Sequence, residues 1–122
     1  MQYNRQKYQD AYTRLSDFAE RFPNAKKRTD ALWYAGFSAY LDGAYGQART
    51  AWERLLVDHP KSQMTAHAHY WVGRAYAKSK RSEKAAAAYR KAFNHAPLSY
   101  YGFMASARLK EMGEKTVFAP PP

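Results

Sequence analysis

The sequence predicts an all-α fold, a right-handed superhelix of antiparallel helix pairs with about six helices. Three observations support this prediction. Prolines recur every 37 residues, an apolar face with helical spacing precedes each proline, and glycines recur at the same interval in the segments between. A fixed period of this length is typical of repeat proteins, in which each unit buries its apolar face against its neighbours.

The repeat is most visible at its prolines. Pro23, Pro60 and Pro97 are 37 residues apart, and each follows a stretch of helical character that a proline would end. Each proline is preceded, at constant distances, by a small residue, then a bulky residue, then a residue of variable size. The three sets are Ala11, Leu15 and Phe18 before Pro23; Ala48, Trp52 and Leu55 before Pro60; and Ala85, Tyr89 and Ala92 before Pro97. The spacing i, i+4, i+7 places each set on one face of a helix, which predicts a packed helix before every proline.

Gly36 and Gly73 are also 37 residues apart, each inside an aromatic-rich segment. A glycine inside a helix costs about 1 kcal/mol relative to alanine, so two at equivalent places indicate close backbone approach between helices. The succession of aromatic, glycine and tyrosine, then alanine, aromatic and proline, resembles the tetratricopeptide repeat (TPR). The second copy fits that family best, whereas Ala39 replaces the tyrosine in the first.

The period also predicts the domain organisation. We expect a TPR-like domain over residues 1–112, made of a lone helix over about 8–22, helix-pair repeats over about 29–60 and 66–97, and an extra helix over about 98–112, with a proline-rich tail over 113–122. No partner helix fits before the first helix, so we expect Met1 to stand inside a repeat. Ser62 and Ser99, two residues after their prolines, are the expected N-caps of the helices that follow.

The segment Pro97–Leu109 carries a second resemblance. Its Ser99-Tyr100-Tyr101-Gly102 and Arg108-Leu109 resemble the Ser-Tyr-Tyr-Gly…Ala-x-Arg-Leu segment that precedes the catalytic domain of soluble lytic murein transglycosylases. The Pro-x-Ser sequences and Tyr70-Trp71-x-Gly73 are similar to periplasmic TPR proteins of outer-membrane assembly and Tol-Pal coordination. Both resemblances imply a periplasmic location near peptidoglycan. The first also implies a scaffold beside a lysozyme-like domain, whose catalytic Glu-Ser pair does not occur in this sequence.

The sequence offers no complete catalytic or metal site. Its glutamates all lie among lysines and arginines, which favour the ionised form over that of a catalytic acid: Glu20, Glu53, Glu83, Glu111 and Glu114. His67 and His69 are two positions apart and point to different helix faces, so they do not form a pair of ligands. We expect no enzyme activity, metal or cofactor in this chain; catalysis would belong to a parent protein with a transglycosylase domain.

The net charge of +10, from 20 basic and 10 acidic residues, favours anionic partners. A basic patch follows the expected first helix of the second copy: Lys78, Lys80, Arg81 and Lys84. A solvated turn and a binding patch are both open interpretations. Nucleic acid is an unlikely partner because no helix-turn-helix, zinc or stacking-sheet signature accompanies the charge. No apolar run approaches the roughly 20 residues that cross a bilayer.

In TPR stacks the first helix of each pair lines a concave groove. The register assigns to this groove Asp30, Trp33, Phe37 and Tyr40 from the first copy, and His67, Tyr70, Arg74 and Lys78 from the second. The aromatic residues have two interpretations, contact with a bound peptide or packing against neighbouring helices. Arg74 and Lys78 share one helix face and are the stronger candidates for ligand contact.

Two functional hypotheses remain. The first is a non-catalytic scaffold and protein-interaction domain of a peptidoglycan-processing, lytic transglycosylase-like protein of the cell envelope. The second is a free-standing periplasmic adaptor that binds a partner peptide in its concave groove. The expected partner is a protein or peptide, with peptidoglycan as a further candidate, and helix faces left uncovered at the ends make self-association an additional expectation.

Overall fold

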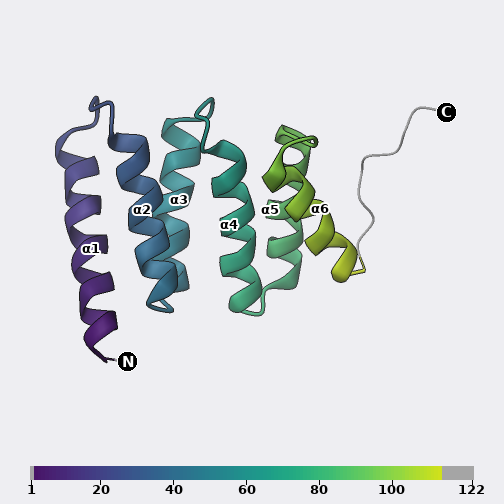
Figure 1. The fold of residues 1–122 in the computed structure, drawn as a ribbon, viewed down its shortest axis with the longest axis horizontal. Coiled ribbons are helices and arrows are strands. Elements are labelled where there is room, and N and C mark those ends of the chain that lie inside the picture. Colours follow the sequence, from purple (N-terminus) through teal and green to yellow (C-terminus); the bar gives the residue numbers. More distant parts are fainter. Residues whose placement is uncertain (1, 114–122) are drawn as a thin grey trace. The chain divides into compact units, whose positions relative to one another are not determined.

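A computed structural model describes residues 2–113, with side chains from residue 5 onward. This part of the chain contains six α-helices and no strand (Figure 1). The helices are α1 (Gln2–Arg21), α2 (Arg28–Leu41), α3 (Tyr45–Asp58), α4 (Thr65–Lys78), α5 (Ser82–His95) and α6 (Tyr100–Glu111). The prediction of an all-α, TPR-like fold with about six helices is confirmed. The expected tail lies, from residue 114, outside the described residues.

The chain divides into two compact units of three helices each, Met1–Met64 and Thr65–Pro122. In the first unit α2 packs against both α1 and α3. In the second unit α5 packs against α4 and α6, and α6 also contacts α4. Figure 1 shows α4 and α5 running antiparallel, with α6 returning along α5. The antiparallel pairs α2–α3 and α4–α5 correspond to the two expected repeats.

The lone helix expected over about 8–22 is α1, which begins earlier, at Gln2. Its first residues are mostly polar and carry no apolar periodicity, so the pattern gave no sign of them. Polar contacts hold this end of the helix instead. Arg5 donates from Nε to Oδ1 of Asp42 at 3.0 Å, and Gln9 donates from Nε2 to Oδ2 of the same carboxylate at 2.7 Å.

The two repeat glycines lie where the helices of each pair touch. Trp52 of α3 is fully buried, and a Cβ at Gly36 of α2 would overlap its indole ring. A Cβ at Gly73 of α4 would lie 2.5 Å from Cε1 of Tyr89 in α5. Neither position has room for a side chain. The predicted close approach is therefore confirmed in both copies.

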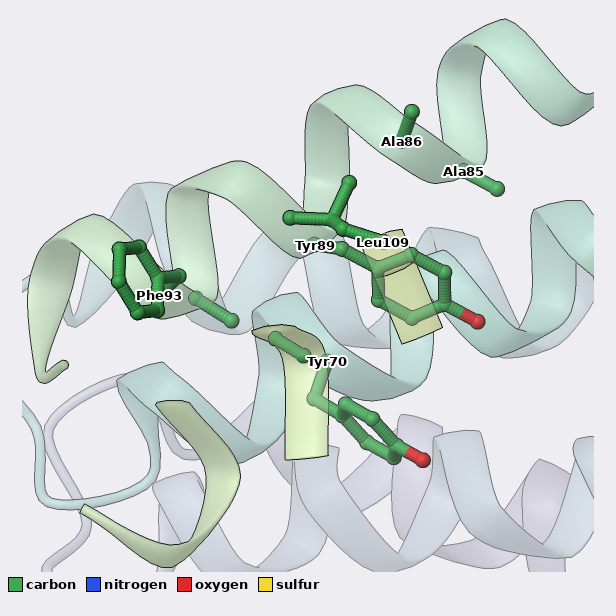
Figure 2. Packing of buried hydrophobic residues seen from close by; sticks show 8 residues of the cluster. Tyr70, Ala85, Ala86, Tyr89, Phe93 and Leu109 are labelled. Carbon is green, nitrogen blue, oxygen red and sulfur yellow. The ribbon is translucent and has the colours of Figure 1, made fainter. Parts of the chain in front are cut away.

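The core of the second unit surrounds the paired tyrosines Tyr70 and Tyr89 (Figure 2). Their ring centroids are 5.6 Å apart, and both hydroxyl groups point to the same side of the cluster. Leu109 of α6 is fully buried in this core, which fixes α6 on the α4–α5 pair. Ala85, Tyr89 and Ala92, the face predicted from spacing, are all buried.

One of the two predicted serine caps is correct. Ser99 is the N-cap of α6, and its Oγ accepts a hydrogen bond from the backbone N–H of Gly102 at 3.0 Å. Ser62 is not the cap of α4, because that helix begins only at Thr65. Its Oγ accepts from the backbone N–H of Met64 at 3.0 Å, in the turn before the helix. The connection before α4 is longer than the one before α6. A serine two residues after the proline therefore caps α6 but lies before the start of α4.

Candidate functional site

The three aromatic groove candidates of the first unit pack within their own helix pair. Trp33 and Phe37 of α2 stack with ring centroids 5.9 Å apart, and Trp33 also stacks on Trp52 at 5.5 Å. Tyr40 lies 6.1 Å from Trp52 and 5.3 Å from Tyr45. All three candidates are half-buried. These contacts match the packing interpretation, although part of each ring still reaches the surface. Asp30, on the same helix, is exposed.

Two of the groove candidates in the second unit lie under α6. The ring of His67 is 4.0 Å from that of Tyr101, and burial lowers the pKa of His67. Tyr70 is only 2% exposed and belongs to the core. Helix α6 therefore covers positions of α4 that the repeat register assigns to an open groove.

Two arginines converge on the hydroxyl of Tyr70. Arg74 Nη1 donates to this oxygen at 3.3 Å from one turn along α4, and Arg108 Nε donates to it at 3.2 Å from α6. The hydrogen bond from Arg108 to Tyr70 raises the pKa of Arg108. The guanidinium of Arg74 also lies 5.7 Å from the ring centre of Trp71. A buried acceptor thus holds two cationic groups close together.

A surface cavity of about 310 Å³ opens beside these arginines. Its lining comes from all three helices of the unit and the residues that adjoin them: Arg74, Ala77, Lys78, Ser82, Tyr89, Arg108, Glu111 and Met112. We call it the arginine cavity. Three of these side chains are cationic and one is acidic, so the cavity carries net positive charge. The predicted contact residues Arg74 and Lys78 both line it.

The predicted basic patch does not coincide with the arginine cavity. Lys78 lines the cavity, but Lys80, Arg81 and Lys84 do not and are exposed at the α4–α5 turn or the start of α5. Lys80 has a left-handed backbone with a φ of 62°. Lys84 places Nζ 5.8 Å from the ring centre of Tyr76. Only one of the four patch residues therefore lines the arginine cavity.

Arg108 is the site residue that sequence reasoning missed. It stands in Ala105-Ser106-Ala107-Arg108-Leu109, within the segment that departs from the repeat, so the repeat register gave it no groove position. The motif drew attention to the segment but did not say which residue its arginine meets. The packing of α6 against α4 brings Arg108 to Tyr70, 38 positions earlier in the chain.

The first unit contains a buried arginine with a different role. Arg28, only 6% exposed, donates from Nε to the carbonyl oxygen of Ala19 at 2.9 Å. Its Nη1 donates to Nε2 of His59 at 2.9 Å and lies 3.0 Å from Oδ2 of Asp58. These partners come from α1, α3 and the C-cap of α3. Arg28 therefore joins the ends of the three helices of its unit.

A second cavity, of about 490 Å³, lies beside Arg28. Its charged lining contains three acids and two arginines: Glu20, Glu53, Asp58, Arg28 and Arg54. Glu20 pairs with Arg54 and Asp58 pairs with Arg28. This cavity is therefore close to charge balance and offers no single-signed site to a ligand.

Two structural findings bear on metals and membranes. Within residues 2–113, histidine, aspartate and glutamate side chains form no cluster of three or more that could hold a metal ion. In the same range, no helix has the length and apolar character needed to cross a bilayer.

Comparison with known protein families gives a match over most of the chain. The model of the YfiO family, described as an outer membrane lipoprotein, matches residues 1–108. The matched range includes α1 to α5 and most of α6, and with them the arginines at 74 and 108. A comparison with curated proteins finds no match. The relation to lytic transglycosylases predicted from the Pro97–Leu109 segment stays a prediction.

Proposed function

The chain belongs to the YfiO family of outer membrane lipoproteins, and from this premise we propose that it is a non-catalytic scaffold that binds a partner protein through its second unit. The family consists of TPR-like scaffolds rather than enzymes, and membership places the protein in the cell envelope. The proposal adds where the partner binds. A segment of the partner lies against α4 and α6 and enters the arginine cavity.

The arginine cavity is the observation that carries this proposal. By contrast, the aromatic groove candidates of the first unit pack on their own helix pair, and the cavity beside Arg28 is lined by three acids and two arginines. The arginine cavity instead combines a volume of about 310 Å³, open to the surface, with three cationic side chains. Its volume is near the lower end of the range for ligand pockets, which suits one or two side chains of a protein segment.

Photo-crosslinking in the envelope of living cells tests the binding site. Ala77 lines the cavity and is exposed, so a photo-reactive phenylalanine at this position should crosslink to a discrete envelope protein. Ala87 on α5 is a matched control, because it is also an exposed alanine of the same unit but does not line the cavity. Equal crosslinking from both positions, or none from Ala77, would contradict the proposal.

A second candidate is a scaffold within a lytic transglycosylase-like protein that processes peptidoglycan. The favouring observation is α6, where the resembling segment forms a capped helix that exposes the large side chains of Tyr100 and Phe103, with Leu98 exposed just before it. A lysozyme-like domain encoded after residue 122 would support this candidate. The chain alone should release no muropeptides from purified peptidoglycan, and release would contradict both candidates.

A further inference from the structure

We propose that the arginine cavity binds the carboxylate of a glutamate or aspartate side chain on the partner protein. This inference rests on the proposed scaffold function and adds the chemical group that is recognised. Its basis is the geometry of the two arginines, the lining around them and the distribution of charge along the chain.

The two guanidinium groups are held in place before any ligand arrives. Both donate to the hydroxyl of Tyr70, at 3.3 Å from Arg74 and 3.2 Å from Arg108, and the ring of Tyr70 is fixed in the core. A guanidinium carries five N–H donors in a planar fork, so one arginine can take part in several hydrogen bonds at once. This fork matches the two oxygens of a carboxylate, and holding it in place reduces the entropy lost on binding.

The remaining lining suits an acidic side chain and its methylene groups. Lys78 adds a third cation one helical turn after Arg74, on the same face. Ala77, Tyr89 and Met112 provide apolar surface beside the cations. A volume of about 310 Å³ admits a side chain with its adjoining backbone but excludes a folded domain.

Glu111 already places a carboxylate in this cavity. Its Oε1 lies 3.4 Å from Nη1 of Arg108, at the long end of hydrogen-bond distances, and its side chain is 63% exposed. Exposed ion pairs of this kind contribute little stability. A partner's carboxylate can therefore replace Glu111 at Arg108. The internal pair supplies a residue with which to test whether the cavity accepts a carboxylate.

The charge of the second unit favours an acidic partner over long range. Of its residues, 10 are lysine or arginine and 3 are aspartate or glutamate, whereas the first unit has 10 and 7. Most of the net charge of +10 is thus on the unit that contains the cavity. Such a field accelerates association with an acidic surface. Peptidoglycan stem peptides also carry carboxylates, but membership of a scaffold family favours a protein ligand.

Arginine side-chain NMR on the full chain tests the inference with three probes. The first is a five-residue alanine peptide with one central glutamate, acetylated and amidated at its ends, and the second replaces glutamate by glutamine. The third is a peptidoglycan stem peptide. The glutamate peptide should shift the Nε–H signals of Arg74 and Arg108, and the glutamine peptide should not. Equal shifts from both peptides, no shift from the glutamate peptide, or clear preference for the stem peptide would overturn the inference.

Charge variants separate the cavity from the general field of the unit. Glu111→Gln removes the internal competitor and should strengthen binding of the glutamate peptide by about threefold. Lys78→Gln should weaken it by about fivefold. Lys84→Gln, which removes the same charge outside the cavity, should change it by less than about twofold. Equal losses from Lys78→Gln and Lys84→Gln, or no gain from Glu111→Gln, would contradict a defined site.

These outcomes are distinguishable from failure of the proposed function. If Ala77 crosslinks to a discrete protein while the glutamate peptide does not bind, the scaffold function stands and the carboxylate inference falls. If neither occurs, both fall. None of the charge variants replaces a core residue, and a thermal melt of each variant confirms that its fold is intact.

Discussion

The two units share one type of helix-pair core but differ in how their charges are used. In the first unit, three ion pairs connect different helices or their ends, Arg5 with Asp42, Arg28 with Asp58 and Arg54 with Glu20, and one, Arg21 with Asp17, lies within α1. In the second unit, Arg74 and Arg108 gather around a neutral hydroxyl, and the pair Arg108–Glu111 lies within α6. The first unit thus uses these arginines to connect its helices, whereas Arg74 and Arg108 of the second unit line the arginine cavity, where we propose that a ligand binds.

The aromatic residue that fills the glycine gap also differs between the copies. Trp52 and Tyr89 stand 37 positions apart and are both buried. Trp52 donates from Nε1 to the carbonyl oxygen of Trp33 at 3.1 Å, so its polar atom stays inside the pair. Tyr89 lines the arginine cavity. The same repeat position is therefore purely structural in one copy and part of the candidate site in the other.

Replacing these two aromatics should have the largest effect. Trp52→Ala and Tyr89→Ala should each lower the free energy of unfolding by about 3–5 kcal/mol, because each removes a large buried ring. Chemical denaturation measures the loss, and amide hydrogen exchange locates it. Exchange should accelerate mainly in the unit that carries the substitution. Equal acceleration in both units would contradict the division at residue 64.

Arg28→Met should lower the free energy of unfolding by about 3 kcal/mol. The substitution keeps an apolar stem but leaves the carbonyl of Ala19 and the carboxylate of Asp58 without their cationic partner. Arg54→Met is the matched control, since both members of its pair with Glu20 are exposed, and should cost less than about 1 kcal/mol. Similar losses of unfolding free energy in the two variants would contradict burial of Arg28 as the cause of the larger effect.

Gly36→Ala and Gly73→Ala should each lower the free energy of unfolding by about 2 kcal/mol. Alanine is the better helix former by about 1 kcal/mol, but its Cβ would press on a buried ring. Shortening that ring should relieve the clash. Trp52→Leu should therefore cost less in the Gly36→Ala background than in the wild type, which a double-mutant cycle measures. Additive effects would contradict direct contact as the cause.

Stability of the second unit should fall as the pH falls from about 6.5 to 4. Burial, with Lys91 and His95 nearby, lowers the pKa of His69 from 6.5 to about 4. The unfolded chain then takes up a proton before the folded chain does, so the stabilisation is complete above pH 6.5 and disappears towards pH 4. After allowance for partial exposure, the loss is about 1–2 kcal/mol. Denaturation at several pH values should show a flatter dependence in His69→Gln, and an unchanged slope would contradict this origin.

Ser99→Ala should have the smallest effect, a loss of about 1 kcal/mol in the free energy of unfolding. It removes the cap that accepts from the backbone N–H of Gly102. Ser62→Ala is the control, because Ser62 bonds within a turn and does not cap a helix, and should cost less than about 0.5 kcal/mol. Equal losses would mean that the two serines play equivalent parts after all.

Local pattern was sufficient for most of the fold and indicated two residues that line the candidate site. The prolines, the apolar faces and the glycines indicated the helix pairs, because each depends on residues within one or two turns or at a fixed interval. Arg74 and Lys78 were predicted as contact residues because they share a helix face, and their spacing in the sequence is enough to show this. The early start of α1 was missed, since its polar contacts with Asp42 leave no periodic signal.

The sequence by itself determined that this chain folds into TPR-like helix pairs and that glycines face large rings inside each pair. Only the tertiary structure decided which cations meet. Arg108 reaches Tyr70 because Leu109 anchors α6 in the core of the second unit, and Tyr101 of the same helix covers His67. Contacts between residues so far apart in the chain depend on how whole helices pack. The 37-residue period does not specify the packing of α6, because the sequence of α6 departs from the repeat pattern.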